Sequence, residues 1–370
     1  MHVGLNLVYL VPGETGGMEV YARELIPALL AAAGHEWKFT AFVSREAAAA
    51  DGPWSEMPSV GVPVHSANRA AWVYGEQALL PRLAAQRRVD LVHSLATTAP
   101  GWGPFRRVTT IHDLHYRTVP EAHFGVRSLG MRALVPLAAR RSHRVIAISQ
   151  ATRDDIVALL HVPPGRIDVI HQGLGRRRRT DARPPRGLDA GDRPLLLTAA
   201  AKRPHKNLGA LLDALALLPT EQRPVLVLPG YATPYEATLK ERAAALGVAS
   251  EVRFLGWVDD AEMEWLYAAA TAFVFPSLAE GFGLPVLEAM ARGLPVACSN
   301  RPPLTEVAAD AALTFDPGSP RAIADAVVRL LGDRSLRERL RARGTARAAA
   351  FNWSVTAERT LASYRRALAR

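Results

Sequence analysis

The chain has 370 residues, of which 49% are hydrophobic and 22% are charged, and a single cysteine, Cys298. This composition excludes global disorder, and one cysteine excludes an internal disulfide and favours a reducing setting. The net charge of +10 favours phosphorylated ligands or anionic surfaces, although arginine-rich helical segments such as residues 334–347 explain much of it as solvated surface charge.

The start of the chain is typical of a folded strand. It has no basic leader and no cleavage-type run of small residues, so we expect no signal peptide. The longest stretches without Asp, Glu, Lys or Arg, residues 91–105 and 265–279, are shorter than the roughly 20 residues that span a bilayer. We therefore expect no transmembrane helix and a cytoplasmic protein.

Short apolar runs alternate with helical patterns in the first half of the chain. This alternation predicts a parallel sheet with helices on both faces. Pro27 and Pro136 fall inside two predicted helices and should kink or shorten them. The predicted strands are residues 3–10, 38–43, 89–93, 108–112, 145–149 and 167–171, and the predicted helices are residues 18–33, 75–87, 124–141 and 151–160.

A basic, proline-containing segment, residues 173–193, interrupts this alternation and is typical of a linker or a long loop. After it the alternation resumes. The predicted strands are residues 195–198, 225–228, 252–255, 272–276, 295–299 and 313–315, and helices are expected to begin near Asn207, Thr233, Asp259, Pro285 and Ser319.

The fold class is therefore α/β, with two Rossmann-like domains. We expect an N-terminal domain over residues 1–174, a linker over 175–193 and a C-terminal domain over 194–351, with a terminal helix over 352–370 that packs back on the first domain. Two such domains facing each other form a cleft at the carboxyl ends of their strands, where open α/β sheets bind ligands.

Several common signatures are missing. No G-x-G-x-x-G follows the first strand, and the chain contains no P-loop, no Cys/His cluster and no Asp-x-Asp pair. The absence of these signatures removes the usual support for NAD binding, for Walker-type nucleotide hydrolysis and for a metal held against a diphosphate.

Two loops have the composition of an anion site. Gly16 and Gly17 follow the first strand and precede a helix, where glycine lets an anion approach free backbone N–H groups. In the second half, Lys202, Arg203 and Lys206 lie between a strand and the next helix. These cations suit a phosphate that side chains have to neutralise.

The most specific motif runs from Phe275 to Met290. A strand leads into a glycine-rich loop that carries Glu280, and Pro285 is well placed to start a helix that carries Glu288. Two carboxylates around such a turn can accept hydrogen bonds from two sets of hydroxyls, while free N–H groups between them face a phosphate.

These residues resemble a known family. The segment Glu280-Gly281-Phe282-Gly283-Leu284-Pro285-Val286-Leu287-Glu288 is similar to the E-x7-E motif of glycosyltransferase family 4, a family of retaining enzymes with the GT-B fold. The resemblance covers nearly the whole chain. It includes Gly16-Gly17-Met18-Glu19, Thr110-Ile111-His112-Asp113-Leu114, typical of the mannosyltransferase-like branch, and Lys206-Asn207-Leu208.

In the second domain the resemblance implies a donor site. Glu280 would bind hydroxyls of the donor sugar near the reacting centre, Glu288 would bind ribose hydroxyls, and Lys206 would neutralise the leaving β-phosphate. The remaining donor contacts would come from Gly281, Phe282, Gly283 and Leu284, whose loop faces the sugar and diphosphate, and from Trp257 and Val258 near the base.

In the first domain the resemblance implies that Gly16 and Gly17 close on the diphosphate and that His112 lies beside the donor sugar. One departure concerns the phosphate clamp, since the family usually has an arginine five residues before the lysine and this chain has Ala201 there. The candidates for the second cation are Lys202 and Arg203.

The activity implied is metal-independent transfer of a hexosyl group with retention, without a cofactor. The donor would be a nucleotide-diphosphate sugar, GDP-mannose first, with UDP- and dTDP-sugars left open. The acceptor hydroxyl would belong to a glycan, a lipid or a small natural product, because the first-domain loops carry no signature that decides between them.

Two other functions remain open. A GT-B-shaped hydrolase or epimerase would act on the donor alone, and a polyanion-binding protein would use the basic surface and be indifferent to Glu280. We expect no nucleic-acid partner, since such a protein gains nothing from paired glutamates. The arginine-bearing helix over residues 124–144 leaves open a peripheral contact with the inner face of an anionic membrane.

Overall fold

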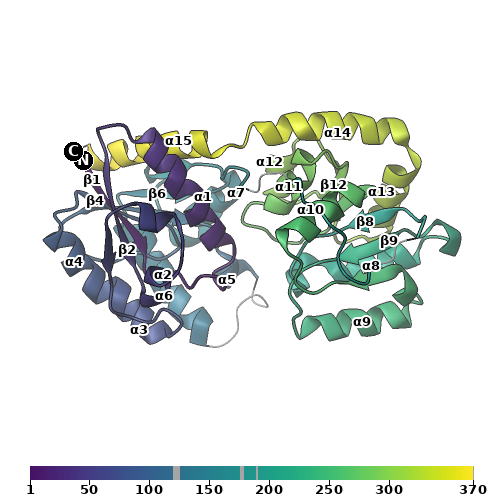
Figure 1. The fold of residues 1–370 in the computed structure, drawn as a ribbon, viewed down its shortest axis with the longest axis horizontal. Coiled ribbons are helices and arrows are strands. Elements are labelled where there is room, and N and C mark those ends of the chain that lie inside the picture. The colour runs from purple at the N-terminus through teal and green to yellow at the C-terminus, as the bar shows by residue number, and fades with distance from the viewer. Residues whose placement is uncertain (120–125, 176–178, 189–190, 370) are drawn as a thin grey trace. The chain divides into compact units, whose positions relative to one another are not determined.

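The computed structural model describes residues 1–119, 126–175, 179–188 and 191–369, and the side chains of residues 126–129 lie outside that description. The described residues divide into two compact units. The first consists mainly of residues 1–118, 126–175 and 351–369, and the second of residues 179–188 and 191–350. Each unit is built on a parallel sheet of its own (Figure 1), which confirms the predicted α/β class.

A seven-stranded sheet forms the centre of the first unit, in the order β3-β2-β1-β4-β5-β6-β7 with every adjacent pair parallel. The carboxyl ends of the strands therefore share one edge of the sheet, and the amino ends share the other. The strands are β1 (His2–Leu7), β2 (Lys38–Val43), β3 (Ser59–Gly61), β4 (Leu91–Ser94), β5 (Arg106–Ile111), β6 (Arg144–Ala147) and β7 (Ile167–Val169).

Helices connect these strands. A π-helical turn, η2 (Gly75–Leu79), replaces part of the single helix predicted over residues 75–87. The others are α1 (Gly17–Ala32), α2 (Arg45–Ala48), η1 (Pro53–Glu56), α3 (Arg69–Tyr74), α4 (Leu80–Gln86), α5 (His115–Thr118), α6 (Val126–Arg141), α7 (Gln150–Leu160), η4 (Pro164–Arg166) and the terminal α15 (Trp353–Leu368).

The second unit has a six-stranded parallel sheet in the order β10-β9-β8-β11-β12-β13. Its strands are β8 (Leu195–Leu197), β9 (Val225–Leu228), β10 (Val252–Phe254), β11 (Ala272–Phe275), β12 (Val296–Ser299) and β13 (Leu313–Phe315). Its helices are η5 (Pro204–Lys206), α8 (Leu208–Ala216), η6 (Thr220–Gln222), α9 (Tyr235–Ala245), η7 (Ala249–Glu251), α10 (Asp260–Ala269), α11 (Leu284–Ala291), α12 (Leu304–Ala308), α13 (Pro320–Gly332) and α14 (Arg334–Ala349).

Local capping explains several helix starts. Asp259 accepts from the backbone N–H of Glu262, whose side chain accepts in turn from the backbone N–H of Asp259, so the two residues form a capping box at the predicted helix start. The Ser319 side chain likewise caps α13. Asn207 does not cap α8 through its side chain, because its backbone is left-handed, with φ 58°, and its amide points elsewhere.

The two internal prolines do not end their helices. α1 continues through Pro27 and α6 through Pro136, so of the two predicted effects, a kink or a shorter helix, the shorter helix is wrong. Pro27 lies on the exposed side of α1, where water can donate a hydrogen bond to the carbonyl oxygen of Arg23, which the missing proline N–H leaves without a helical donor. The three-residue strand β3 was not predicted, since it is too short for a periodic signal.

Helix α15 completes the core of the first unit. Leu361 and Tyr364 are buried in the same cluster as Tyr21 of α1, and the ring of Trp353 meets that of Tyr21 edge-on at 5.6 Å. Gly173 is required where the chain passes under α15, because a Cβ there would lie 2.4 Å from the backbone nitrogen of Trp353.

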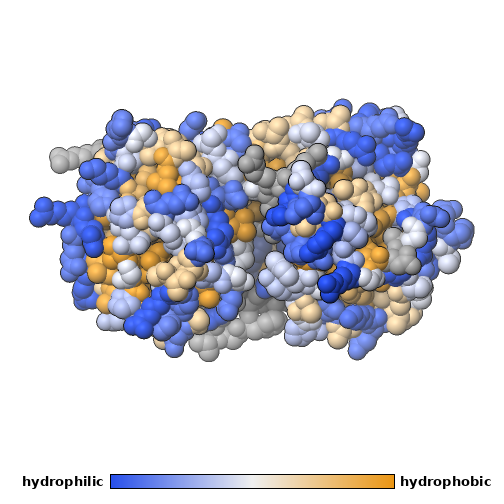
Figure 2. All heavy atoms as spheres, in the orientation of Figure 1, coloured by the Kyte–Doolittle hydropathy of each residue, from blue (hydrophilic) through white to orange (hydrophobic). Residues whose placement is uncertain are grey.

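The surface is charged over both units. Figure 2 shows hydrophilic residues spread over the visible face of each unit, which agrees with an arginine surplus carried mostly by solvated helices. Among the described residues, no helix is both long enough and apolar enough to cross a membrane. Of the four consecutive arginines in the linker, residues 176–178 lie outside the described residues, and Arg179 pairs with Asp181 at 2.6 Å.

Candidate active site

A lysine and a glutamate meet at the carboxyl edge of the second sheet. Lys206 follows β8 and Glu280 follows β11, which are neighbours in the sheet. Lys206 Nζ lies 2.6 Å from Glu280 Oε1, and the two side chains are only 18% and 10% exposed. Such a pair offers a cation for a phosphate and a carboxylate for hydroxyls within one small region.

Backbone hydrogen bonds hold the two loops together. The N–H of Leu278 and the hydroxyl of Ser277 both donate to the carbonyl oxygen of His205, at 2.8 and 3.2 Å. The amide of Asn207 donates to the carbonyl oxygen of Pro276 at 3.1 Å. The residue after Lys206 therefore fixes the position of the lysine relative to the glutamate loop.

The glycine-rich loop leads directly into α11. Gly283 has φ 110°, and a Cβ at this position would lie 2.6 Å from a methyl carbon of Leu304, so only glycine fits. Phe282 is buried and anchors the loop, while Gly281 and Leu284 are partly exposed. Pro285 has no N–H, and the N–H groups of Val286 and Leu287 donate to the carbonyl oxygen of Gly283. The helix start available to an anion is therefore at Leu284, four residues after Glu280.

A chain of contacts orients Glu288, one turn into α11. The hydroxyl of Tyr267 donates to Glu288 Oε2 at 3.0 Å. Arg292 packs over the Tyr267 ring at 4.6 Å and forms a 2.8 Å ion pair with Glu264. Arg292 and Glu264 are nearly buried and hold Tyr267 in place, whereas Glu288 is partly exposed. The second carboxylate oxygen of Glu288 is therefore available to a ligand.

The two candidates for the second cation have different environments. Lys202 is fully buried, and its ammonium donates to the carbonyl oxygens of Gly230 at 2.5 Å and Leu255 at 2.6 Å. Burial lowers the pKa of Lys202, against the opposing effect of Glu236. Lys202 thus ties together the loops that follow β8, β9 and β10, whereas Arg203 is exposed and better able to reach a ligand.

Two exposed aromatic rings stack at the same edge. Trp257, after β10, is 61% exposed, and Tyr231, after β9, is 53% exposed. Their ring centroids are 4.5 Å apart with planes 24° from parallel, and Val258 adjoins them. Sequence reasoning placed Trp257 near a base but missed Tyr231, which no motif marks; exposed stacked aromatics offer a flat surface for another ring.

In the first unit, the glycine turn precedes α1. Gly16 has φ 61° and ψ −132°, a region that essentially only glycine adopts, and a Cβ on Gly17 would meet open space. Glu19 stabilises the turn by accepting from the backbone N–H of Gly13 at 2.7 Å and pairing with Arg23 at 2.8 Å. The N–H groups of Glu19 and Val20 donate to the carbonyl oxygen of Gly16, so the exposed part of this helix start is at Gly17.

His112 follows β5 and is 8% exposed. Its Nε2 donates to the carbonyl oxygen of Leu95 at 2.8 Å, and its ring meets Tyr21 edge-on at 4.9 Å. Burial lowers its pKa, so the neutral imidazole carries its proton on Nε2 and leaves Nδ1 as the acceptor. The ring is held rigidly at the carboxyl edge of the first sheet.

A buried carboxylate network at that edge escaped the sequence analysis. Glu76 in η2 is fully buried and accepts from the amide of Asn6 at 2.9 Å and the hydroxyl of Thr98 at 3.0 Å. Only the tertiary structure could reveal it, because Glu76 has the sequence context of an ordinary solvated helix residue. In the part of the chain that the structure describes, no three His, Cys, Asp or Glu side chains converge to hold a metal.

Two family models together match most of the chain. The model described as Glycosyltransferase Family 4 matches residues 15–177, and the one described as Glycosyl transferases group 1 matches residues 180–347. The chain is 34% identical to O-antigen chain mannosyltransferase B of Escherichia coli over 70% of each chain. It is 31% identical to D-inositol 3-phosphate glycosyltransferase of Frankia alni over 96% of each.

Solved structures share the fold. Sucrose-phosphate synthase from Thermosynechococcus elongatus superposes with a TM-score of 0.77 at 22% identity, covering 99% of this chain and 98% of that one. Anabaena Alr3699/HepE, solved in complex with UDP and glucose, gives 0.73 at 20% identity, covering 99% of each. At these identities the likeness establishes the architecture.

Proposed function

Because the chain belongs to glycosyltransferase family 4 and has the GT-B class of fold, we propose that it transfers a hexosyl group from a nucleotide-diphosphate sugar to an acceptor hydroxyl, with retention and without a metal. The observation that carries this proposal is the 2.6 Å contact between Lys206 and Glu280 beside the N-terminus of α11.

The second unit supplies the donor site in this proposal. Glu280 accepts hydrogen bonds from sugar hydroxyls, and Glu288, oriented by Tyr267, accepts from the ribose. The N–H groups from Gly281 to Leu284 face the diphosphate. The base stacks on the exposed face of the Tyr231–Trp257 pair, which adds Tyr231 to the Trp257 and Val258 that the sequence indicated.

In this proposal the reaction is accelerated by stabilising the negative charge that develops on the leaving diphosphate. The acceptor oxygen forms a bond to C1 of the donor sugar, the bond from C1 to the β-phosphate oxygen breaks, and the acceptor proton passes to that phosphate. Lys206 and the α11 N-terminus stabilise the negative charge that develops on the diphosphate. Arg203 is the second cation, because the buried ammonium of Lys202 is committed to carbonyl oxygens.

The first unit contributes the remaining groups. We assign the turn at Gly16 and Gly17 to the diphosphate and His112 to the donor sugar. A GDP-mannose donor is favoured by the relatives named as mannosyltransferases and by the His112-Asp113-Leu114 segment. The acceptor class is a glycan, a lipid or a small natural product.

Calorimetric titration with GDP, UDP, dTDP and ADP in EDTA tests the donor site. We expect one nucleotide to bind and Glu288→Ala to weaken it about tenfold or more, in line with the loss of a charge-assisted hydrogen bond. Glu241→Ala is the matched control, since Glu241 lies exposed on α9 in the same unit. Wild-type protein that binds none of the four would contradict the proposal.

A second variant separates the phosphate clamp from the rest of the site. Lys206→Met should weaken the binding of the nucleoside diphosphate about tenfold or more. The binding of the corresponding monophosphate should not change, because only the diphosphate carries the β-phosphate. Equal weakening of both nucleotides would show that Lys206 does not meet the β-phosphate.

A further inference from the structure

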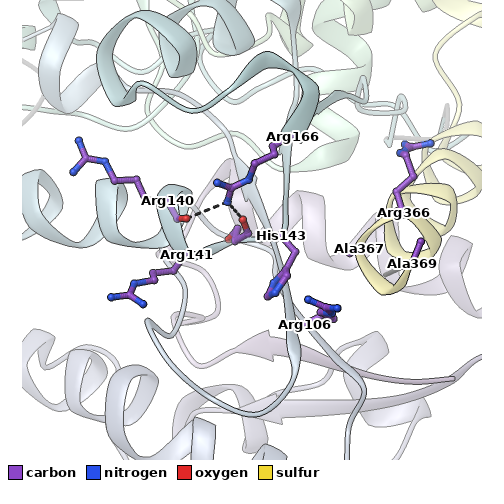
Figure 3. Close-up of a pocket in the computed structure, with 9 residues that line it drawn as sticks. Arg106, Arg140, Arg141, His143, Arg166, Arg366, Ala367 and Ala369 are labelled. Atoms are coloured by element: carbon purple, nitrogen blue, oxygen red, sulfur yellow. Dashed lines mark hydrogen bonds between the residues drawn. The ribbon is translucent and has the colours of Figure 1, made fainter.

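The first unit has a concave basic pocket at the amino edge of its sheet, opposite to the carboxyl edge that carries His112. The pocket has a volume of about 430 Å³ and lies where β5 and β6 begin and where α6 and α15 end. Figure 3 shows the side chains that surround it. It is lined by Arg106, Arg140, Arg141, Ser142, His143, Arg166, Arg366, Ala367 and Ala369.

The charge of this pocket is unbalanced. Five of its lining residues are arginines and none is an acid. The nearby carboxylate of Asp168 is shared by Arg144 at 2.5 Å and Arg366 at 2.9 Å, and it also accepts from Ser363 at 2.6 Å. Within the described part of the chain, the other four arginines of the pocket form no ion pair.

The ends of the helices do not explain these arginines. Cations near a helix C-terminus offset its partial negative charge, which amounts to about half an elementary charge. At the end of α6, Arg166 already donates to the carbonyl oxygens of Arg140 and Ser142, as the dashed lines in Figure 3 show. The guanidinium groups of Arg140 and Arg141 are exposed and remain in excess of what the helix end requires.

The titration of neighbouring groups indicates the same positive field. Burial lowers the pKa of His143 most, and together with the charges of Arg107, Arg106 and Arg166 it brings this pKa to about 4. Nδ1 of His143 accepts from the backbone N–H of Arg107 at 3.1 Å, so this neutral ring adds no charge to the pocket. An anion entering the pocket would offset the field that these arginines create.

We propose that this pocket binds a small anion bearing two or more phosphoryl charges, free in solution or at the end of a lipid headgroup. One guanidinium group can donate two hydrogen bonds to the oxygens of a phosphoryl group, and several arginines lining one pocket favour a multivalent anion over a monovalent one. A concave pocket of this volume suits a compact ligand. The site is separate from the proposed donor site, whose Lys206 and Glu280 belong to the second unit.

Calorimetric titration of inorganic pyrophosphate into the full chain carrying Lys206→Met tests this proposal without the proposed phosphate clamp. We expect Arg140→Gln/Arg141→Gln to weaken binding about tenfold or more. Neither side chain makes a hydrogen bond or ion pair among the described residues, so the variant should fold normally. Arg321→Gln/Arg339→Gln is the matched control, since both arginines are exposed on the second unit and the net charge changes equally.

The NMR titration of His143 gives a local readout. Pyrophosphate bound in this pocket should raise the pKa of His143 by about one unit or more, because the anion offsets the facing arginines. A ligand held only in the second unit would leave it unchanged. Failure of nucleotide binding would overturn the proposed function and leave this readout unaffected.

Vesicles distinguish the two sources of phosphoryl groups. If the ligand is a headgroup, the wild type and the control should bind vesicles of equal parts phosphatidic acid, whose headgroup is a terminal phosphate, and phosphatidylcholine. The Arg140/Arg141 variant should not bind these vesicles, and phosphatidylcholine alone should bind none of the three proteins. Absence of both pyrophosphate and vesicle binding would overturn the proposal, as would equal losses in the variant and the control.

Discussion

Glu76 is a buried carboxyl group whose pKa affects how the stability of the first unit depends on pH. Its carboxylate has no exposure to solvent, and Asn6, Thr98 and Gln77 donate to it at 2.9, 3.0 and 3.2 Å. Burial raises its pKa to about 7 despite these donors. The group therefore changes charge near neutral pH at the carboxyl edge of the sheet.

This shift predicts a pH dependence of stability. Between the ordinary value of 4.5 and about 7, the folded state holds a proton that the unfolded state has lost. The free energy of unfolding should therefore fall as pH rises through this window, by about 3 kcal/mol in total. Hydrogen exchange of the β1 and β4 amides should show this fall in the wild type and not in Glu76→Gln. The same slope in both proteins would contradict it.

Helix α15 depends on polar as well as apolar contacts. The hydroxyl of Tyr364 lies 2.6 Å from Nδ1 of His93, whose Nε2 lies 2.9 Å from the hydroxyl of Thr110. Burial lowers the pKa of His93 to about 3, so the ring is neutral: one of its nitrogens donates an N–H to one hydroxyl, and the other nitrogen accepts from the other hydroxyl. The terminal helix is thereby tied to β4 and β5.

Removing the Tyr364 hydroxyl should loosen this helix. Tyr364→Phe leaves a nitrogen of the fully buried His93 without its partner, which costs about 1–3 kcal/mol. Hydrogen exchange should therefore quicken in α15 and β4. Tyr74→Phe is the control, since Tyr74 is 57% exposed, and protection in α15 that is equal in the two variants would refute this role for the hydroxyl.

The two units draw on the sequence differently, because the first combines segments from both ends of the chain. Among the described residues, the second unit is formed almost entirely by residues 179–188 and 191–350, whereas the first requires residues 351–369 from the end of the chain. The rings of Trp353 and Tyr364 fill the space between α1 and the sheet. The first unit consequently cannot bury its core from the N-terminal half of the sequence alone.

Fragments of the chain should behave accordingly. A fragment of residues 1–175 should aggregate or unfold without cooperativity, because it exposes the apolar cluster that α15 covers. Joining residues 351–369 to it through a short flexible linker should restore cooperative thermal unfolding, measured by circular dichroism. If residues 1–175 alone unfold at the same temperature as the joined fragment, α15 is dispensable for the first unit.

The sequence determined much of the fold because its signals are local. Apolar runs buried on both faces, such as β8 and β9, and the capping box at Asp259 are specified by neighbouring residues. Helix breaks and short strands were less predictable: α1 passes through Pro27, and β3 has only three residues. In both cases burial and pairing with distant residues outweighed the local pattern.

The same division applies to the candidate sites. The sequence by itself determined the family and the principal donor-site candidates, because the residues concerned lie in short motifs. Glu280 and Glu288 belong to one motif, and Lys206 is followed by Asn207, whose amide donates to the loop that carries Glu280. Only the tertiary structure decided that Lys202 ties loops together, that Tyr231 stacks on Trp257 and that arginines from four segments surround one pocket. These features depend on groups that are distant in sequence and become neighbours only when parallel strands align their ends.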